Sequence, residues 1–352
     1  MSDSIPTTRE IAQACGCNSS TVSRALSNSP LISEATRTRI LKVAKKMGWR
    51  PNPIVSAYVA HRRASSKQQY QATLAYIVDN EILGKKNGIT YREIHFHGAQ
   101  EHAKQLGFKL EVFRLSEVEN NTKRLGQLIK SRGIPGIIIP DPKMLNFLAQ
   151  AQFDWNSFSF ATSGYHYHSL PLNRSVVYWP HGIRLMVEQI REYGYRNIAF
   201  IISEDFDRLT DFVLSSTFYH YQIHPQAGEK YNSFIIPSSI KDPEKRIADW
   251  LIKQRPDAVI STHATWKAIH DLGWKVPGDI AFASPHWSPE WPQIAGLNQD
   301  WQTLGANAVE LIANQINTNI RGLPKTPKVL VSNGFWVDGD STPKRTAISS
   351  PE

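Results

Sequence analysis

The chain has 352 residues, 41% of them hydrophobic, and a formal net charge of +9. This length and composition predict two or three domains with buried cores and exclude a disordered protein. No apolar run approaches the roughly 20 residues that a membrane-spanning helix needs. The first residues show no basic segment followed by an apolar one, and the two cysteines are too few for a zinc site. We therefore expect a cytoplasmic protein with no cofactor, no metal and no membrane partner.

The charge is concentrated at one end of the chain. Residues 1–70 hold 11 Lys and Arg against 3 Asp and Glu, a net charge of +8, which leaves +1 for the other 282 residues. Lys and Arg contacts to phosphates supply most of the non-specific affinity of nucleic-acid binders. A solvated basic face is the alternative, and the helix pattern favours the nucleic-acid interpretation.

The first predicted helix begins at a capping box. Thr7 can cap it, and Glu10 can reach back to the Thr7 backbone. Gly16 is expected to end it, because glycine adopts a left-handed backbone without a Cβ clash. We expect Cys15 and Cys17 to be small apolar core residues rather than partners in a disulfide.

A second short helix is expected after Asn18, a favourable N-cap residue. Val22, Ala25 and Leu26 form the stripe that such a helix buries. The opposite face carries small polar residues and one arginine: Ser19, Ser20, Ser23 and Arg24. Small polar groups allow close approach to base edges, and an arginine can bind guanine with two hydrogen bonds.

A third helix is expected after Ser33. Its predicted buried stripe is Ile40, Val43, Ala44 and Met47. Its predicted outer face is basic, with Arg37, Arg39, Lys42, Lys45 and Lys46. Two short helices about a tight turn, with a third packed across them, predict a helix-turn-helix unit.

The segment after this unit breaks the helical pattern. Pro51-Asn52-Pro53 cannot continue a helix. Residues 54–61 can form a short helix, and the polar residues up to 71 are typical of a linker. A lone eight-residue helix is unstable in water, so we expect it to fold only against its twin or a DNA groove.

Residues 7–63 resemble the DNA-binding head of the lactose-repressor (LacI/GalR) family. The matching motifs are Glu10-Ile11-Ala12, Gly16, Ser20-Thr21-Val22-Ser23-Arg24-Ala25-Leu26, Ser33-Glu34-Ala35-Thr36-Arg37 and Arg50-Pro51-Asn52-Pro53. The resemblance implies base contacts from Ser19, Ser20 and Arg24. It implies phosphate contacts from Thr8, Asn18, Thr21, Ser33 and Thr36, and a minor-groove hinge helix with Asn52, Val55 and Tyr58. Tyr58 departs from the leucine wedge that is usual in the family.

From residue 72 the sequence alternates between strand and helix signals, which favours parallel sheets with helices on both faces. The expected strands are 73–78, 110–113, 136–140, 198–202, 233–236, 258–261 and 280–283. The expected helices are 96–106, 118–131, 182–193 and 243–254. We therefore expect an all-α head and hinge joined to an α/β body of two doubly wound parallel-sheet subdomains.

The resemblance adds a periplasmic-binding-protein-like clamp in which the chain crosses three times between subdomains. Residues 294–301 would be a return crossing, the helix 303–317 would return to the first subdomain, and Val329–Val337 to the second. The expected domains are a helix-turn-helix domain (1–50), a hinge and linker (51–71), an effector-binding and dimerisation domain (72–342) and a flexible tail (343–352).

The clamp is expected to hold a small molecule, because aromatic and polar residues are frequent near its strand ends. The candidate pocket residues are Asp79, His97, Tyr165, Trp266 and His286; Tyr91, His95, Trp287 and Trp291 lie in similar places. Two carboxylates of the family's sugar site are replaced, one by Tyr178 with His181 nearby and one by His286. The sequence therefore leaves open a carbohydrate, a more apolar or anionic ligand, or none.

The function predicted is a sequence-specific transcriptional regulator, a repressor, that binds a near-palindromic DNA operator as a homodimer and responds to a small-molecule effector. A solute-binding protein that uses the clamp alone is the alternative, but it predicts a signal peptide and no basic head. The sequence shows none of the phosphate-loop, serine-hydrolase, dinucleotide-binding or zinc-protease motifs, so an enzyme is not expected.

Overall fold

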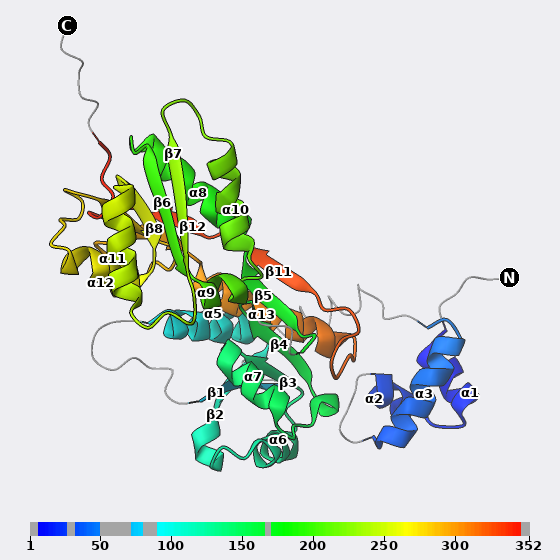
Figure 1. Ribbon diagram of the computed structural model, residues 1–352. Coiled ribbons are helices and arrows are strands. Elements are labelled where there is room, and N and C mark those ends of the chain that lie inside the picture. The colour runs from blue at the N-terminus through cyan, green and yellow to red at the C-terminus, as the bar shows by residue number, and fades with distance from the viewer. Residues whose placement is uncertain (1–5, 27–31, 50–71, 80–89, 166–169, 346–352) are drawn as a thin grey trace, which may run out of the picture.

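The computed structural model describes residues 6–26, 32–49, 72–79, 90–165 and 170–345. The described residues form a head of three helices, α1 to α3, and a body built on two sheets (Figure 1). The predicted hinge, with Asn52, Val55 and Tyr58, lies outside the described residues. Among the described residues, no helix is both long and apolar enough to cross a membrane.

The head consists of α1 (Thr8–Cys15), α2 (Ser19–Leu26) and α3 (Glu34–Lys46). The predicted capping box is confirmed: Thr7 N–H donates to Glu10 Oε2 at 2.6 Å, and Glu10 N–H donates to Thr7 Oγ1 at 3.3 Å. Gly16 ends α1 with φ of +61°. Ser33 caps α3 by accepting from the Thr36 N–H. These local signals fix where each helix begins or ends.

One small core joins the three head helices. Ile11, Val22, Ala25 and Ile40 are completely buried, and Cys15 is buried beside them. Cys17 is half-buried at the edge of the same cluster. The prediction that both cysteines are free and pack in this core therefore agrees with the structure.

One residue of α3 and the residue after it differ from the prediction. Arg37 is buried rather than exposed, because it shares a helix face with Ile40 and Ala44, three and seven residues further on. Its Nη2 donates to the Ile32 carbonyl at 3.2 Å. Met47 follows the helix as its C-cap and is 36% exposed instead of buried.

The first sheet of the body has the order β11-β5-β4-β3-β1-β2, and all its pairings are parallel. Its strands are β1 (Ala72–Val78), β2 (Phe108–Arg114), β3 (Gly136–Ile139), β4 (Ser159–Ser163), β5 (Asn173–Val177) and β11 (Val329–Ser332). Its helices are α5 (Tyr91–Gln105), α6 (Thr122–Ser131), α7 (Pro142–Gln150) and α13 (Trp301–Asn317), with 3-10 turns at Leu115–Val118 and Trp155–Ser157. Separate apolar clusters join the sheet to α6 with α7 and to α5 with α13, so both faces are covered.

The second sheet has the order β12-β10-β9-β8-β6-β7 and is parallel except for the antiparallel edge strand β12. Its strands are β6 (Asn197–Ser203), β7 (Lys230–Ile236), β8 (Ala258–Ser261), β9 (Ala281–Ser284), β10 (Ala295–Asn298) and β12 (Phe335–Val337). Its helices are α8 (Trp179–Glu192), α9 (Glu204–Leu209), α10 (Val213–Ile223), α11 (Pro243–Gln254) and α12 (His263–Asp271). Here too two clusters cover opposite faces, one with α8 and α10 and one with α11 and α12. The predicted pair of doubly wound subdomains is confirmed.

The chain crosses between the two sheets three times, at residue 178, at 299–300 and at 333–334. The predicted return of α13 to the first subdomain is confirmed by its packing against β3 and β4. The assignment of Val329–Val337 to the second sheet was wrong for its first half. Val329–Ser332 pairs with β5 in the first sheet, and only Phe335–Val337 reaches the second.

Several body elements were not predicted, and β4 shows why. Its sequence, Ser-Phe-Ala-Thr-Ser, has no long apolar run, yet every residue is buried. The hydroxyls of Ser159 and Thr162 donate to the carbonyls of Ile320 and Ile139 at 2.8 and 2.7 Å. Burying these polar groups is tolerated because they are bonded, and hydrophobicity alone does not report this.

Candidate functional site

The exposed face of α2 carries the side chains predicted to read DNA bases. Ser20 and Arg24 are exposed and Ser19 is partly exposed, whereas Val22 and Ala25 are buried against the rest of the head. The helix therefore presents small hydroxyls and one guanidinium outward. This is the chemistry suited to base edges in a major groove.

The predicted phosphate-contact residues lie at the starts of the three head helices. Thr8, Asn18 and Ser33 are exposed, and Thr21 and Thr36 are partly exposed. Backbone N–H groups at a helix N-terminus attract anions such as phosphates. The exposed basic residues of α3 are Arg39, Lys42, Lys45 and Lys46. The head thus combines a small polar surface with local positive charge.

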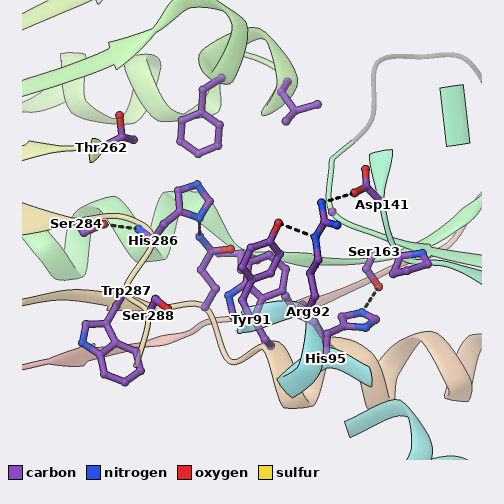
Figure 2. Close-up of a pocket in the computed structure, with 18 of the residues that line it drawn as sticks. Tyr91, Arg92, His95, Asp141, Ser163, Thr262, Ser284, His286, Trp287 and Ser288 are labelled. Carbon is purple, nitrogen blue, oxygen red and sulfur yellow. Dashed lines mark hydrogen bonds and ion pairs between the residues drawn. The ribbon is translucent and has the colours of Figure 1, made fainter. Parts of the chain in front are cut away.

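A cavity of about 720 Å³ lies between the two subdomains of the body. It is formed at the carboxyl ends of strands: Asp79 follows β1, Asp141 lies after β3, and Tyr165 follows β4. On the other side, Thr262 follows β8 and His286 lies after β9. Ligands of open α/β sheets bind in this position. Figure 2 shows Arg92, Asp141 and Ser163 on one side of the cavity and His286 and Trp287 on the other.

Four of the five predicted pocket residues line the cavity: Asp79, Tyr165, Trp266 and His286. His97 does not; it is exposed on the opposite side of α5 from His95, which does line the cavity. Residues two positions apart on a helix point about 200° apart around its axis, so His95 and His97 cannot share a face. Tyr91, Trp287 and Trp291 also line the cavity, as their positions suggested.

An ion pair on the cavity wall was missed by the sequence analysis. Arg92 Nη2 donates to Asp141 Oδ2 at 2.9 Å, and Arg92 Nε donates to the Tyr91 hydroxyl at 3.3 Å (Figure 2). Arg92 is one turn before His95 on α5, whose early start is set by a second capping box between Thr90 and Glu93. That box was the signal that could have placed Arg92 on the helix.

A buried chain of three side chains lies beside this pair. His95 Nδ1 bonds the Tyr76 hydroxyl at 2.8 Å, and its Nε2 bonds Ser163 Oγ at 2.7 Å. Burial lowers the pKa of His95 to about 4 and raises the pKa of Tyr76. At pH 7 the chain is therefore neutral, with one imidazole nitrogen donating and the other accepting.

His286 connects the cavity to the second crossing between subdomains. Gln299 Nε2 donates to His286 Nδ1 and to the Pro285 carbonyl, the latter at 3.0 Å. The imidazole contacts the rings of Trp179 and Phe206, at centroid distances of 5.9 and 4.8 Å, and these two rings also contact each other. Desolvation by the surrounding protein lowers the pKa of His286 to about 4, while the residue is exposed where it lines the cavity. With Nδ1 accepting, the bonding pattern assigns the proton to Nε2.

Aromatic side chains dominate the second subdomain's side of the cavity. Trp266 meets Phe282 edge-on at 5.1 Å, and Trp291 is 47% exposed beside His263. Tyr178 and His181, which replace a family carboxylate, do not line this space. Within the described parts of the chain, no group of three His, Cys, Asp or Glu side chains could hold a metal ion.

Comparisons with known proteins agree with this architecture. The pattern of "Bacterial regulatory proteins, lacI family" matches residues 7–52, and that of a "Periplasmic binding protein-like domain" matches residues 187–342. The NTD biosynthesis operon regulator NtdR of Bacillus subtilis is 27% identical over 135 residues. That alignment covers 38% of this chain and 37% of NtdR, so the chain matches little more than a third of that relative's length.

Two solved structures share the fold along almost the whole chain. The transcriptional regulator CelR, in complex with cellobiose, is 19% identical with a TM-score of 0.51 and covers 96% of this chain and 99% of its own. The Lac repressor dimer, bound to operator and the anti-inducer ONPF, is 18% identical with the same TM-score and the same two coverages. Both have the head and the body in one chain. Residues 7–52 therefore match the lacI family of bacterial regulatory proteins, residues 187–342 match a periplasmic-binding-protein-like domain, and the chain shares the fold of both solved structures.

Proposed function

We propose that this chain is a sequence-specific transcriptional regulator, a repressor, that binds a near-palindromic operator as a homodimer and responds to a small-molecule effector. The observation that carries the proposal is the combination of two sites in one chain. An exposed polar face on α2 suits DNA bases, and a 720 Å³ cavity between the subdomains suits a small ligand.

In this proposal the head divides its contacts by chemistry. Ser19, Ser20 and Arg24 read bases, while Thr8, Asn18, Thr21, Ser33 and Thr36 contact phosphates. The hinge would act in the minor groove through Asn52, Val55 and Tyr58. Phosphate contacts fix the register on the duplex, and base contacts give the sequence preference.

The cavity lies between the subdomains, so a ligand bound there can change their relative orientation. Its lining includes residues at two of the crossings, Val177 and Trp179 at the first and Gln299 and Trp301 at the second. A ligand that favours one arrangement shifts the population toward it. In a dimer, that shift would alter the spacing of the paired hinges and heads, which couples ligand affinity to operator affinity.

The effector proposed is a carbohydrate. Arg92 and Asp141 offer adjacent donors and acceptors, which suit hydroxyl groups, and the aromatic rings suit the apolar faces of a sugar ring. CelR, which shares this fold, has been solved with cellobiose. Asp79, Tyr165, Trp266 and His286 are the remaining proposed ligand contacts.

We further propose that the protein acts on DNA in the cytoplasm and performs no catalysis, since the lacI family that its head matches consists of regulatory proteins. A solute-binding role for the clamp alone does not account for the head or its basic charge.

Selection from a pool of random DNA duplexes tests the proposal. The full-length protein should enrich a near-palindromic motif, and its band-shift stoichiometry should be two chains per duplex. Failure to enrich any palindrome across a range of salt concentrations would overturn the proposal.

A further inference from the structure

Three side chains on the first subdomain's wall form a hydrogen-bonded chain that the proposed function does not use. His95 is bonded to the Tyr76 hydroxyl through Nδ1 at 2.8 Å and to Ser163 Oγ through Nε2 at 2.7 Å. All three residues line the cavity, and none is more than 3% exposed. Figure 2 shows the bond between His95 and Ser163 on the same wall as Arg92 and Asp141. The hydrogen positions in this chain decide what Ser163 offers to a ligand.

Two arrangements of the hydrogens satisfy both bonds. The imidazole is neutral at pH 7, because burial lowers the pKa of His95 to about 4, so one ring nitrogen carries a hydrogen and the other accepts. In the first arrangement, Tyr76 donates to Nδ1 and Nε2–H donates to Ser163. In the second, Nδ1–H donates to Tyr76 and Ser163 donates to Nε2. The first arrangement leaves the Ser163 hydrogen for another acceptor, and the second leaves the Tyr76 hydrogen.

The chemistry of the two hydroxyls favours the first arrangement. A phenol is the more acidic hydroxyl, with an ordinary pKa of about 10, and is therefore the stronger donor. Its oxygen is the weaker acceptor, because one of its lone pairs is delocalised into the ring. A serine oxygen keeps two lone pairs as acceptors. The first arrangement thus uses the better donor to Nδ1 and the better acceptor for Nε2–H.

The position of the two hydroxyls in the fold favours the same arrangement. Ser163 is the last residue of β4, whereas Tyr76 lies two residues before the end of β1. Ligands of α/β sheets bind outside the carboxyl ends of the strands, so a hydrogen on Ser163 is the better placed to meet a ligand. Among the described residues, His95 is the one hydrogen-bond partner of the Tyr76 hydroxyl. The second arrangement would therefore bury an unpaired O–H, which is unfavourable.

No described neighbour accepts the remaining Ser163 hydrogen. Ser175 is in register with Ser163 on the adjacent strand β5, but its Oγ is buried without a hydrogen-bond partner among the described residues. The two serine hydroxyls are therefore not bonded to each other. Within the described part of the chain, the Ser163 side chain is bonded to His95 alone. Its hydrogen is left for a molecule in the cavity.

From this bonding we propose that His95 is a positioning residue, which accepts from Tyr76, donates to Ser163 and so reserves the Ser163 hydrogen for the ligand. Ser163 then acts as a fixed hydrogen-bond donor, and it selects ligands that place an oxygen acceptor beside it. This inference rests on the proposed function, because it names the residue that sets the specificity of one wall of the same cavity.

Nitrogen-15 NMR of the full-length protein with labelled histidine tests the hydrogen positions without any ligand. Long-range proton–nitrogen correlations distinguish Nδ1 from Nε2 and show which of them carries the hydrogen, and the spectrum of His95→Gln identifies the His95 signals. The proposal predicts the Nε2–H tautomer at pH 7. An Nδ1–H tautomer, an imidazolium or a mixture of the two tautomers at pH 7 overturns it.

Titration calorimetry measures the effect on a ligand. A thermal-shift panel of neutral saccharides and nucleosides, whose hydroxyl, ring and carbonyl oxygens can accept from Ser163, first selects the probe that stabilises the full-length protein most. Ser163→Ala should weaken this probe about fivefold, the loss of roughly one hydrogen bond. His95→Phe, which keeps a ring but no nitrogen, should weaken it by a similar factor. His97→Phe, on the far side of α5, is the matched control and should change the affinity less than twofold.

Two further measurements separate positioning from a structural role. The amide of the His95→Gln variant can accept through its oxygen and donate through its nitrogen, so this variant should bind the probe within threefold of the unchanged protein. The losses in Ser163→Ala and His95→Phe should not add in the double variant, because both remove the same bond to the ligand. Additive losses, or unchanged binding in Ser163→Ala, contradict the proposal. If no panel member binds, the tautomer of His95 decides it.

The random-duplex selection separates this inference from the proposed function. Enrichment of a palindrome together with an Nδ1–H tautomer overturns only the role of His95. Failure of the selection overturns the proposed function, whichever tautomer is found.

Discussion

The head and the body place their functional groups in opposite ways. In the head, one small core holds three short helices, and the proposed DNA contacts lie on exposed faces of those helices. In the body, four larger clusters hold two sheets, and the proposed ligand contacts line a cavity between them. The function of the head depends on local helix periodicity, and that of the body depends on contacts between distant segments.

The two regions also use charge differently. The first 70 residues carry +8 of the total +9, which suits long-range attraction to a polyanion. The cavity instead relies on neutral imidazoles and one ion pair, whose hydrogen bonds act at short range. We therefore expect operator binding to depend strongly on salt and ligand binding only weakly.

The largest expected effect is on the body, at the contact between α5 and α13. A Cβ on Gly305 would lie 2.0 Å from the His95 carbonyl oxygen, which is backbone and cannot rotate away. Gly305→Ala should destabilise the body by more than about 4 kcal/mol or prevent its folding. Gly126→Ala is the control, because its Cβ would meet only ordinary contacts at 3.5 Å. Equal urea midpoints for the two variants would contradict the close packing.

A smaller loss is expected from the head core. Ile40 is completely buried between α1 and α2, and Ile40→Ala should cost about 2–5 kcal/mol. Because the head has so little other core, operator binding should disappear while ligand binding to the body is retained. Loss of both activities together would show that the two regions do not fold separately.

The stability of the body should depend on pH through His95. The folded-state pKa of His95 is about 4, below its ordinary value of 6.5, so the unfolded chain binds a proton first as the pH falls. The stability provided by neutral His95 should be complete above pH 6.5 and decrease by up to about 1.4 kcal/mol for each pH unit between 6.5 and 4. His95→Gln should flatten this slope in urea titrations, and His97→Gln should leave it unchanged. A slope of the opposite sign would be inconsistent with a buried neutral imidazole.

The smallest effect is expected from one exposed side chain of the head. Arg24→Ala should weaken binding to the preferred operator by about 1–3 kcal/mol and relax the preference at one base pair. Lys45→Ala, on the exposed surface of α3, should weaken all sequences alike and lower the salt dependence. If Arg24→Ala also weakens all sequences alike, Arg24 contacts phosphate and not a base.

The fold of the head was easier to predict from the sequence than the fold of the body. The starts of α1 and α3 and the end of α1 followed from Thr7, Ser33 and Gly16, because caps are local signals. Arg37 was misplaced because its charge suggested exposure, whereas its position in the helix repeat places it inside.

In the body, α11 and β8 were predicted to the residue, but β4 and α12 were missed. The buried Thr162 hydroxyl of β4 is bonded only in the tertiary structure, where it donates to the carbonyl of Ile139, 23 residues earlier.

The candidate site was predicted in part for a related reason. Asp79 follows the predicted strand 73–78, so the general rule for α/β sheets places it at the crevice. Tyr165 follows β4, which was not predicted. Arg92 and Asp141 are 49 residues apart in the sequence, and no local pattern joins them. His97 was misassigned to the cavity. The predicted helix began at residue 96, whereas α5 begins at Tyr91, so the sequence did not show that His95 and His97 lie on opposite faces of one helix. Asn52, Val55 and Tyr58 lie outside the described residues, so their roles remain predictions.

The central claim is that one chain couples a ligand in the cavity to an operator on the head. The most direct test is a pair of titrations: operator affinity with and without the selected ligand, and ligand affinity with and without the selected operator. If the two sites are coupled, the ligand changes the operator Kd by at least fivefold, and the operator changes the ligand Kd by the same factor, as linkage requires. Two affinities that are independent of each other would contradict the claim.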